Sequence, residues 1–236
     1  MRMCGTCGCS ENTEQSSAPR VVPLEQRVLA KNDELAESNR AWLRERGVVA
    51  INLMSSPGAG KTTLLERTLR DFTGAAVGVV EGDQETDFDA ARLRAAGCSA
   101  VQLNTGTGCH LDAAMVRRGL EELQPPAGSV VFVENVGNLV CPALFDLGEQ
   151  AGVVIASVPE GEDKPLKYPH MFRAADVVLL NKTDLLPHLA FDVRRFEENA
   201  RRINPQVRVL PVSALRGSGL DQWYCWLEAQ LPVAAG

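Results

Sequence analysis

From residue 48 onward, short apolar runs alternate with amphipathic segments. The apolar runs are rich in β-branched residues and predict buried strands. They are VVAINLM (48–54), AAVGVVE (75–81), SAVQLN (99–104), SVVFVE (129–134), GVVIAS (152–157), DVVLLN (176–181) and VRVLPVS (207–213). Helical patterns occupy the gaps, at about 61 onward, 89–97, 113–123, 192–203 and 219–230. This alternation predicts an α/β fold with helices on both faces of a mostly parallel sheet.

The part before the first strand divides in two. Residues 24–46 carry leucine and valine at roughly helical spacing among charges, and Gly47 is the expected end of that helix. Residues 1–23 combine the cysteine-rich MRMCGTCGCS with a polar stretch typical of a flexible tether. We therefore expect a metal-binding N-terminal segment, 1–23, and one domain, 24–236, that begins with the amphipathic helix.

Composition excludes several classes of protein. The net charge of −6 argues against a general nucleic-acid or anionic-membrane partner. No apolar run approaches the roughly 20 residues of a membrane-spanning helix, and the N-terminus lacks an apolar signal core. Seven cysteines without a secretion signal favour reduced, metal-binding thiols over disulfides. We expect a cytoplasmic protein.

The segment SSPGAGKTT (55–63) lies between a predicted strand and a predicted helix, which is the context of a phosphate-binding P-loop. Lys61 is placed to reach the β- and γ-phosphates, and the Thr62 hydroxyl to ligate Mg²⁺. The usual first glycine is Ser55, a minor departure because PGAGKT is intact; a glycine-rich turn without a nucleotide is the alternative. The backbone amides expected around the β-phosphate are those of Gly58, Ala59, Gly60, Lys61, Thr62 and Thr63.

The segment NKTD (181–184) follows a predicted strand and indicates guanine as the base. Asp184 can accept two hydrogen bonds from guanine, which adenine does not offer. Asn181 is expected to brace the site and the Lys182 stem to lie along the base. Ser213 and Ala214 follow the next strand, where their amides can meet the guanine oxygen. Alone, either short pattern is a strand-end turn; their position after a P-loop favours a nucleotide site.

Carboxylates are expected near the γ-phosphate. Glu134 ends a predicted strand and can hold Mg²⁺ through water. Asp83, in the loop EGDQETD, is placed to meet Mg²⁺ or the attacking water. Asp87 is a further candidate in that loop, although it is also suited to cap the next helix.

Two groups of cysteines have metal-ligand character. Cys4, Cys7 and Cys9 place three thiols within six residues, and thiolates suit Zn²⁺, Ni²⁺ or Cu(I). Adventitious thiols on a tail are the alternative. Cys109 and His110, at the start of a predicted helix, and Cys141, after ENVGNLV, form the second group; a buried thiol and a capping histidine are the alternatives there. We interpret the two remaining cysteines, Cys98 and Cys225, as core thiols.

Several of these segments together resemble the HypB family of hydrogenase nickel-incorporation GTPases. They are CxxCGC, SSPGAGKTT, EGDQETD, GTGCHLD (106–112), ENVGNLVCP (134–142), PEGEDKPLKYP (159–169) and NKTDLLP (181–187). The resemblance covers nearly the whole chain. It implies slow GTP hydrolysis to GDP, a GTP-promoted homodimer, and delivery of Ni²⁺ to the [NiFe]-hydrogenase large-subunit precursor with a HypA-like nickel and zinc chaperone.

The resemblance also implies metal sites. Cys4, Cys7 and Cys9 correspond to a tight nickel site, and Cys109, His110 and Cys141 to a second site for Ni²⁺ or Zn²⁺ near the dimer interface. Two departures stand out. Arg2 and Met3 precede the first cysteine, which puts an amine ligand in doubt, and the chain has no histidine-rich tract, which argues against nickel storage.

Three other functions remain open from the sequence: a urease accessory GTPase, a GTPase serving a cobalamin enzyme, and a zinc-stabilised GTP-binding module. The N-terminal CxxCGC and ENVGNLVCP count against the first. The second needs no cysteine clusters. Intact Lys61, Thr62 and Asp184 count against the third. A nucleotide switch is the hypothesis we favour, because Glu134 and Cys141 are only seven residues apart.

Overall fold

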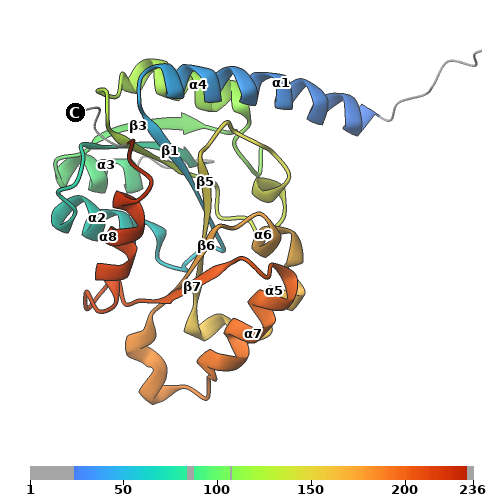
Figure 1. Cartoon of the computed structure of the whole chain (residues 1–236), viewed down its shortest axis with the longest axis vertical. Helices are drawn as coiled ribbons and strands as arrows, with labels where there is room; N and C mark the ends of the chain where they lie inside the picture. Colours follow the sequence, from blue (N-terminus) through green and yellow to red (C-terminus); the bar gives the residue numbers. More distant parts are fainter. Residues whose placement is uncertain (1–23, 84–87, 107, 233–236) are drawn as a thin grey trace, which may run out of the picture.

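Seven parallel strands form a single sheet at the centre of the molecule (Figure 1). The computed structural model describes residues 24–83, 88–106 and 108–232. The strand order is β3-β2-β4-β1-β5-β6-β7. The strands are β1 Val49–Ser55, β2 Val77–Asp83, β3 Ser99–Asn104, β4 Val130–Glu134, β5 Ala151–Ser157, β6 Val177–Asn181 and β7 Arg208–Pro211. The predicted α/β fold is confirmed.

Helices cover both faces of this sheet. The helices are α1 Leu24–Glu45, α2 Lys61–Asp71, α3 Phe88–Ala95, α4 Ala113–Leu123, α5 Lys164–Lys167, α6 Pro169–Arg173, α7 Val193–Ile203 and α8 Leu220–Glu228. Side chains of α2, α3 and α8 share one core with the strands. On the opposite face, α1 and α4 cover the half around β2–β4, and α6 and α7 cover β5–β7 (Figure 1).

The strands are buried because apolar side chains leave both of their faces. Every residue of β1, β4, β5 and β6 is buried. Trp223 of α8 is fully buried and packs against Phe132, while its indole N–H donates to Thr68 Oγ1 at 3.0 Å. This hydrogen bond satisfies the one polar group of the largest core side chain.

The sequence missed the short helical turns between β4 and β7. They are α5, α6 and the 3₁₀ helices η1 Cys141–Ala143, η2 Val158–Glu160 and η3 Thr183–His188. Each contains a proline, which the sequence pattern indicates as a break rather than as a single turn. Cys98 is buried as expected, but the interpretation of Cys225 as a core thiol was wrong, because it lies on the exposed side of α8.

The order of the strands determines where a ligand can bind. After β1 the chain crosses to β2 and β3, returns to place β4 beside β1, and then adds β5 on the other side. The carboxyl ends of β1, β2 and β4 therefore meet where the sheet changes direction, which is where open α/β sheets bind ligands.

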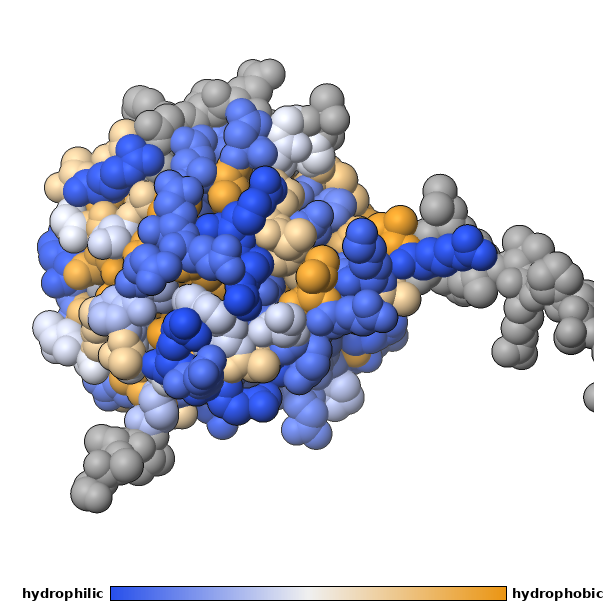
Figure 2. Space-filling view, turned by 90° about the horizontal axis from the view of Figure 1, so that it is seen from above, coloured by the Kyte–Doolittle hydropathy of each residue, from blue (hydrophilic) through white to orange (hydrophobic). Residues whose placement is uncertain are grey.

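None of the helices in the described ranges is long and apolar enough to cross a membrane. Seen from the side of α1 and α4, the surface is mostly hydrophilic, and its apolar residues form small separate patches (Figure 2). Among the described residues visible in this view, apolar side chains therefore form no broad continuous surface.

Candidate functional site

A cavity of about 620 Å³ opens at the carboxyl ends of β1, β2 and β4. Residues 57–63 of the predicted P-loop line it, with 81–83, 134–137, Arg92 and Lys182. The structure thus brings Lys61, Thr62, Asp83 and Glu134 to one cavity, as expected from the sequence. Its volume lies in the range of small-molecule sites.

Gly60 occupies a position where a side chain has no room. Its φ of 102° is in the left-handed region, and an added Cβ would lie 2.5 Å from Asn181 Nδ2. The same Asn181 amide donates to the Ala59 carbonyl at 2.9 Å, and Lys182 Nζ donates to the Gly58 carbonyl at 2.7 Å. The NKTD segment, more than 100 residues later in the chain, therefore fixes the backbone of the P-loop through these two hydrogen bonds.

Ser55 replaces the first glycine of the P-loop pattern without strain, because it is the last residue of β1 and has extended backbone. Its hydroxyl accepts a hydrogen bond from Lys61 Nζ at 2.9 Å and donates one to the Ser56 carbonyl at 2.7 Å. The ammonium group is thus held in the cavity by a neutral acceptor that a phosphate oxygen can replace.

Oxygen ligands gather beside Lys61. The Thr62 hydroxyl donates to Glu134 Oε1 at 3.3 Å, and both residues are buried. Glu81 pairs with Glu134 across the sheet and also lines the cavity. The sequence analysis missed Glu81, although its place near the end of a strand beside Glu134 was a usable signal. A set of carboxylate and hydroxyl oxygens fits Mg²⁺, which prefers oxygen ligands.

The predicted base-binding residues lie together. Asn181 Oδ1 accepts a hydrogen bond from the Ala214 amide at 3.0 Å, and the Ser213 hydroxyl donates to Asp184 Oδ1. Lys182 has a φ of 62°, which is uncommon for a residue with a side chain. Non-glycine residues in this conformation cluster at functional sites because the surrounding structure must hold them there.

A buried ion pair supports the P-loop from the other side and was not found from the sequence. Lys164 is only 5% exposed; its Nζ donates to Ser56 Oγ at 2.8 Å and to Glu160. Ser56 also donates to Glu160. Burial raises the pKa of Glu160, but the hydrogen bonds from Lys164 and Ser56 outweigh it and hold that pKa below its usual range. Glu160 is therefore ionised in this pair at neutral pH.

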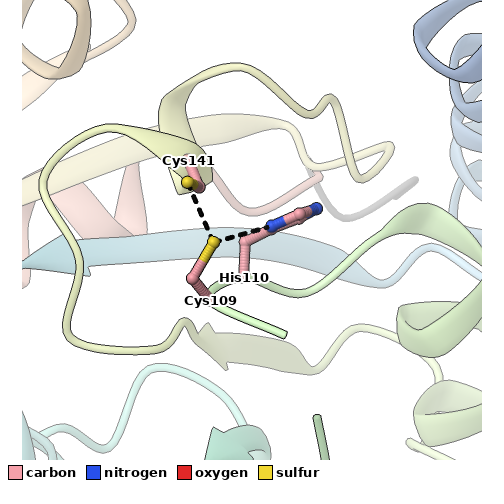
Figure 3. A group of neighbouring side chains, drawn as sticks. All are labelled: Cys109, His110 and Cys141. Carbon is pink, nitrogen blue, oxygen red and sulfur yellow. Dashed lines mark hydrogen bonds between the residues drawn. The ribbon is translucent and has the colours of Figure 1, made fainter. Parts of the chain in front are cut away.

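The second group of predicted metal ligands converges in space (Figure 3). Cys109 Sγ lies 2.9 Å from Cys141 Sγ and 3.6 Å from His110 Nδ1. One ligand atom from each of the three residues lies within 4.8 Å of the others. Two thiols and an imidazole at this spacing can hold one metal ion, and these are the ligands that Ni²⁺ and Zn²⁺ accept.

The loop before α4 makes this convergence possible. The expected helix start at Cys109 was wrong, because α4 begins at Ala113 and the Asp112 side chain caps it by accepting from the Met115 amide at 2.7 Å. Cys109 and His110 thus lie in irregular backbone, where neighbouring side chains can point to one ion.

Neighbouring side chains orient the imidazole of His110, and burial changes the pKa of both the imidazole and the Cys141 thiol. The His110 ring stacks on Phe145 with centroids 3.9 Å apart, which fixes its plane. Burial lowers the pKa of His110, partly opposed by the charge of Asp112. The imidazole is therefore neutral at neutral pH, the form that binds metal. The hydrogen bond that Cys141 shares with Cys109, together with burial, raises the pKa of the Cys141 thiol, so that a metal ion must displace a proton there.

Four of the predicted site residues fall outside the described ranges. They are Cys4, Cys7 and Cys9 of the N-terminal segment, and Asp87 of the loop after β2.

Comparison with known proteins identifies the family. The family model described as CobW/HypB/UreG, nucleotide-binding domain, matches residues 49–211. The hydrogenase maturation factor HypB of Azotobacter chroococcum mcd 1 is 57% identical over 216 residues, which cover 91% of this chain and 70% of the relative. The chain belongs to the HypB family of hydrogenase maturation factors.

Two solved HypB structures share the fold. HypB from Archaeoglobus fulgidus has a TM-score of 0.80 and 40% identity, over 86% of this chain and all of that one. HypB from Helicobacter pylori in complex with nickel has a TM-score of 0.79 and 38% identity, over 87% of this chain and all of that one. This HypB chain is therefore a P-loop NTPase-type nucleotide-binding domain, and the family prediction made from the motifs is confirmed.

Proposed function

We propose that this protein is a GTP-hydrolysing nickel metallochaperone that acts in the cytoplasm and helps insert nickel into the [NiFe]-hydrogenase large-subunit precursor. The observation that carries the proposal is the convergence of Cys109, His110 and Cys141 in the same domain as the P-loop cavity. Membership of the HypB family and the nickel complex of a relative support it. A urease-type assembly GTPase is less well supported, because four relatives at 54–57% identity are named hydrogenase maturation factors, whereas those named hydrogenase/urease maturation factors are 41–44% identical.

In this proposal the cavity binds GTP and GDP. The amides of residues 58–63 surround the β-phosphate, and Lys61 neutralises the β- and γ-phosphates. Thr62 and Glu134, with Asp83, hold Mg²⁺, which when bound stabilises charge on the phosphate oxygens. In the same proposal, Asp83, which lines the cavity, also orients the attacking water.

Asp184 carries the selection of guanine. Changing Asp184 to asparagine removes the carboxylate that pairs with two guanine donors and presents an N–H group to one of them. We expect affinity for GDP to fall about a hundredfold, because an unmatched buried donor is costly. Xanthosine diphosphate offers an oxygen in place of the guanine amine, so its affinity should rise in the same variant. Titration of fluorescent guanosine and xanthosine nucleotides measures both; unchanged preference for guanosine would contradict this role.

Nickel is the cargo of the proposed reaction. Cys109, His110 and Cys141 form a site in the domain, which also accepts Zn²⁺, and Cys4, Cys7 and Cys9 form a tighter site on the N-terminal segment 1–23. Cys141 follows Glu134, the last residue of β4, by seven residues. Between them, Asn138 Oδ1 accepts a hydrogen bond from the Cys141 backbone amide at 3.3 Å. This short connection supports a switch in which hydrolysis loosens the metal site. A GTP-promoted homodimer and a HypA-like partner complete the proposal.

Nickel binding to the reduced protein, measured by competition with a chelator, tests this function. Wild type is compared with a variant in which Cys4, Cys7 and Cys9 are serine, each with GDP and with a non-hydrolysable GTP analogue. We expect the variant to lose one tight site and to keep a weaker site whose affinity depends on the nucleotide by about fivefold or more. If the wild type binds nickel no more tightly than the variant, the N-terminal site is wrong. If neither protein binds nickel, the metallochaperone function is wrong, and a zinc-stabilised GTP-binding module remains.

A further inference from the structure

Leu111, the residue directly after His110, contacts two parts of the nucleotide cavity wall. Its amide donates to Asn135 Oδ1 at 3.1 Å, and its side chain is fully buried. A Cβ added to Gly82 would lie 2.6 Å from Leu111 Cγ, so the leucine packs directly on the Gly82 backbone. Gly82 and Asn135 both line the cavity. One residue of the metal loop, which we define as residues 108–112, is thus fixed to the ends of both β2 and β4.

Asn135 is held rigidly between these elements. It is 1% exposed and directly follows Glu134. Its amide donates to the Leu53 carbonyl of β1 at 3.1 Å, and its Nδ2 lies 3.4 Å from Asn52 Oδ1. Its Oδ1 also accepts the Val136 amide at 3.0 Å. With every polar group of the side chain engaged, Asn135 has little freedom to move without moving its partners.

A second link joins the start of the metal loop to the cavity. The Thr105 amide donates to the Asp83 carbonyl at 3.0 Å, and the Gly108 amide donates to the Thr105 carbonyl at 2.9 Å. The Thr105 hydroxyl lies 3.0 Å from the Gly108 carbonyl. Asp83 therefore anchors one end of the loop that carries Cys109 and His110, and Asn135 anchors the other.

We propose that Asn135 and Leu111 are positioning residues that couple the nucleotide cavity to the half of the metal site formed by Cys109 and His110. A shift of Asn135 on nucleotide exchange must carry Leu111 with it, because the alternative leaves a buried amide without its acceptor. A shift of Gly82 moves the backbone surface on which the Leu111 side chain packs. His110 is the adjacent residue and moves with the same backbone. This inference rests on the proposed function and adds a second path to the connection between Glu134 and Cys141.

The test measures nickel affinity by chelator competition in the Cys4/Cys7/Cys9→Ser background, with GDP and with a non-hydrolysable GTP analogue. We expect the two affinities to differ by about fivefold or more in that background, and by less than about twofold after Asn135→Ala. By reciprocity, the effect of nickel on nucleotide affinity should shrink by the same factor. A purely structural role would change both affinities and leave their ratio intact.

Two further variants sharpen the result. Leu111→Val keeps the hydrogen bond from the backbone amide to Asn135 but removes part of the side-chain contact with Gly82. We expect the ratio of the nickel affinities with the two nucleotides to fall at least about twofold toward one. Asn204→Ala is the matched control. Its side-chain amide donates to the Ala175 carbonyl at 2.8 Å, just before β6, which neighbours the edge strand β7 on the far side of the sheet, so the ratio should stay at the starting value. A full ratio in both Asn135→Ala and Leu111→Val overturns the inference while the chaperone function stands. Absence of nickel binding in the starting protein overturns both.

Discussion

Replacing Lys61 with alanine is expected to lower kcat for GTP hydrolysis by about a thousandfold, the upper range for loss of one group that stabilises transition-state charge. Lys61 is the candidate for this role among the three cations of the described residues that line the cavity. Lys182 Nζ is bonded to the Gly58 carbonyl, and Arg92 forms two hydrogen bonds with Glu66. Lys61 is instead bonded to the Ser55 hydroxyl, a weak neutral acceptor that a phosphate oxygen replaces at little cost.

Single-turnover cleavage of GTP, followed in quenched samples, measures the effect on the chemical step without a contribution from product release. Lys31→Ala is the matched control, because Lys31 is an exposed lysine of α1 and its loss should leave kcat unchanged. The Lys61→Ala protein should also bind GDP more weakly, since Lys61 is proposed to neutralise the β-phosphate. A Lys61→Ala protein that keeps kcat within tenfold of the wild type would contradict the assignment of the phosphate-binding lysine.

The sequence predicted the parts of the fold that depend on local pattern. Strand and helix periodicity located the seven strands and the C-terminal end of α4 at Leu123. The P-loop and NKTD segments were found because their chemistry is concentrated in a few consecutive residues. The hydrogen bond that joins these two segments, from the Asn181 side chain to the Ala59 carbonyl, is seen only in the three-dimensional structure.

Other features escaped the sequence because they depend on contacts between distant segments. Lys164 looked like one charge in a polar loop, yet the fold buries it between Glu160 and Ser56 of the P-loop. Leu111 looked like an ordinary apolar residue beside a metal ligand, and nothing in its neighbourhood along the chain indicates that it packs on Gly82. The backbone conformation of Lys182 could not be predicted from the sequence either, because it adopts a left-handed conformation that its residue type disfavours.

Replacing both Cys109 and Cys141 with serine is expected to lower nickel affinity of the domain site by about a thousandfold, more than the 10- to 100-fold typical of outer-shell changes at metal sites. Both thiols point to the same volume, with the sulfur atoms 2.9 Å apart, so the double variant removes two of three side-chain ligands (Figure 3). A serine hydroxyl does not ionise at neutral pH and is a poor ligand for this metal. His110, which is stacked on Phe145, would remain as a lone ligand.

The background for this measurement is the Cys4/Cys7/Cys9→Ser protein, which reports the domain site alone. Chelator competition gives the affinity, and loss of the thiolate-to-nickel absorption band shows directly that sulfur has left the metal. Cys225→Ser is the matched control, because Cys225 is exposed on α8 and lies outside the cluster. The control should keep both affinity and absorption. If the double variant also keeps both, nickel binds elsewhere, and the convergence of Cys109, His110 and Cys141 is not the cargo site. If the absorption disappears while Lys61-dependent GTP hydrolysis persists, the metal site and the nucleotide site are separable.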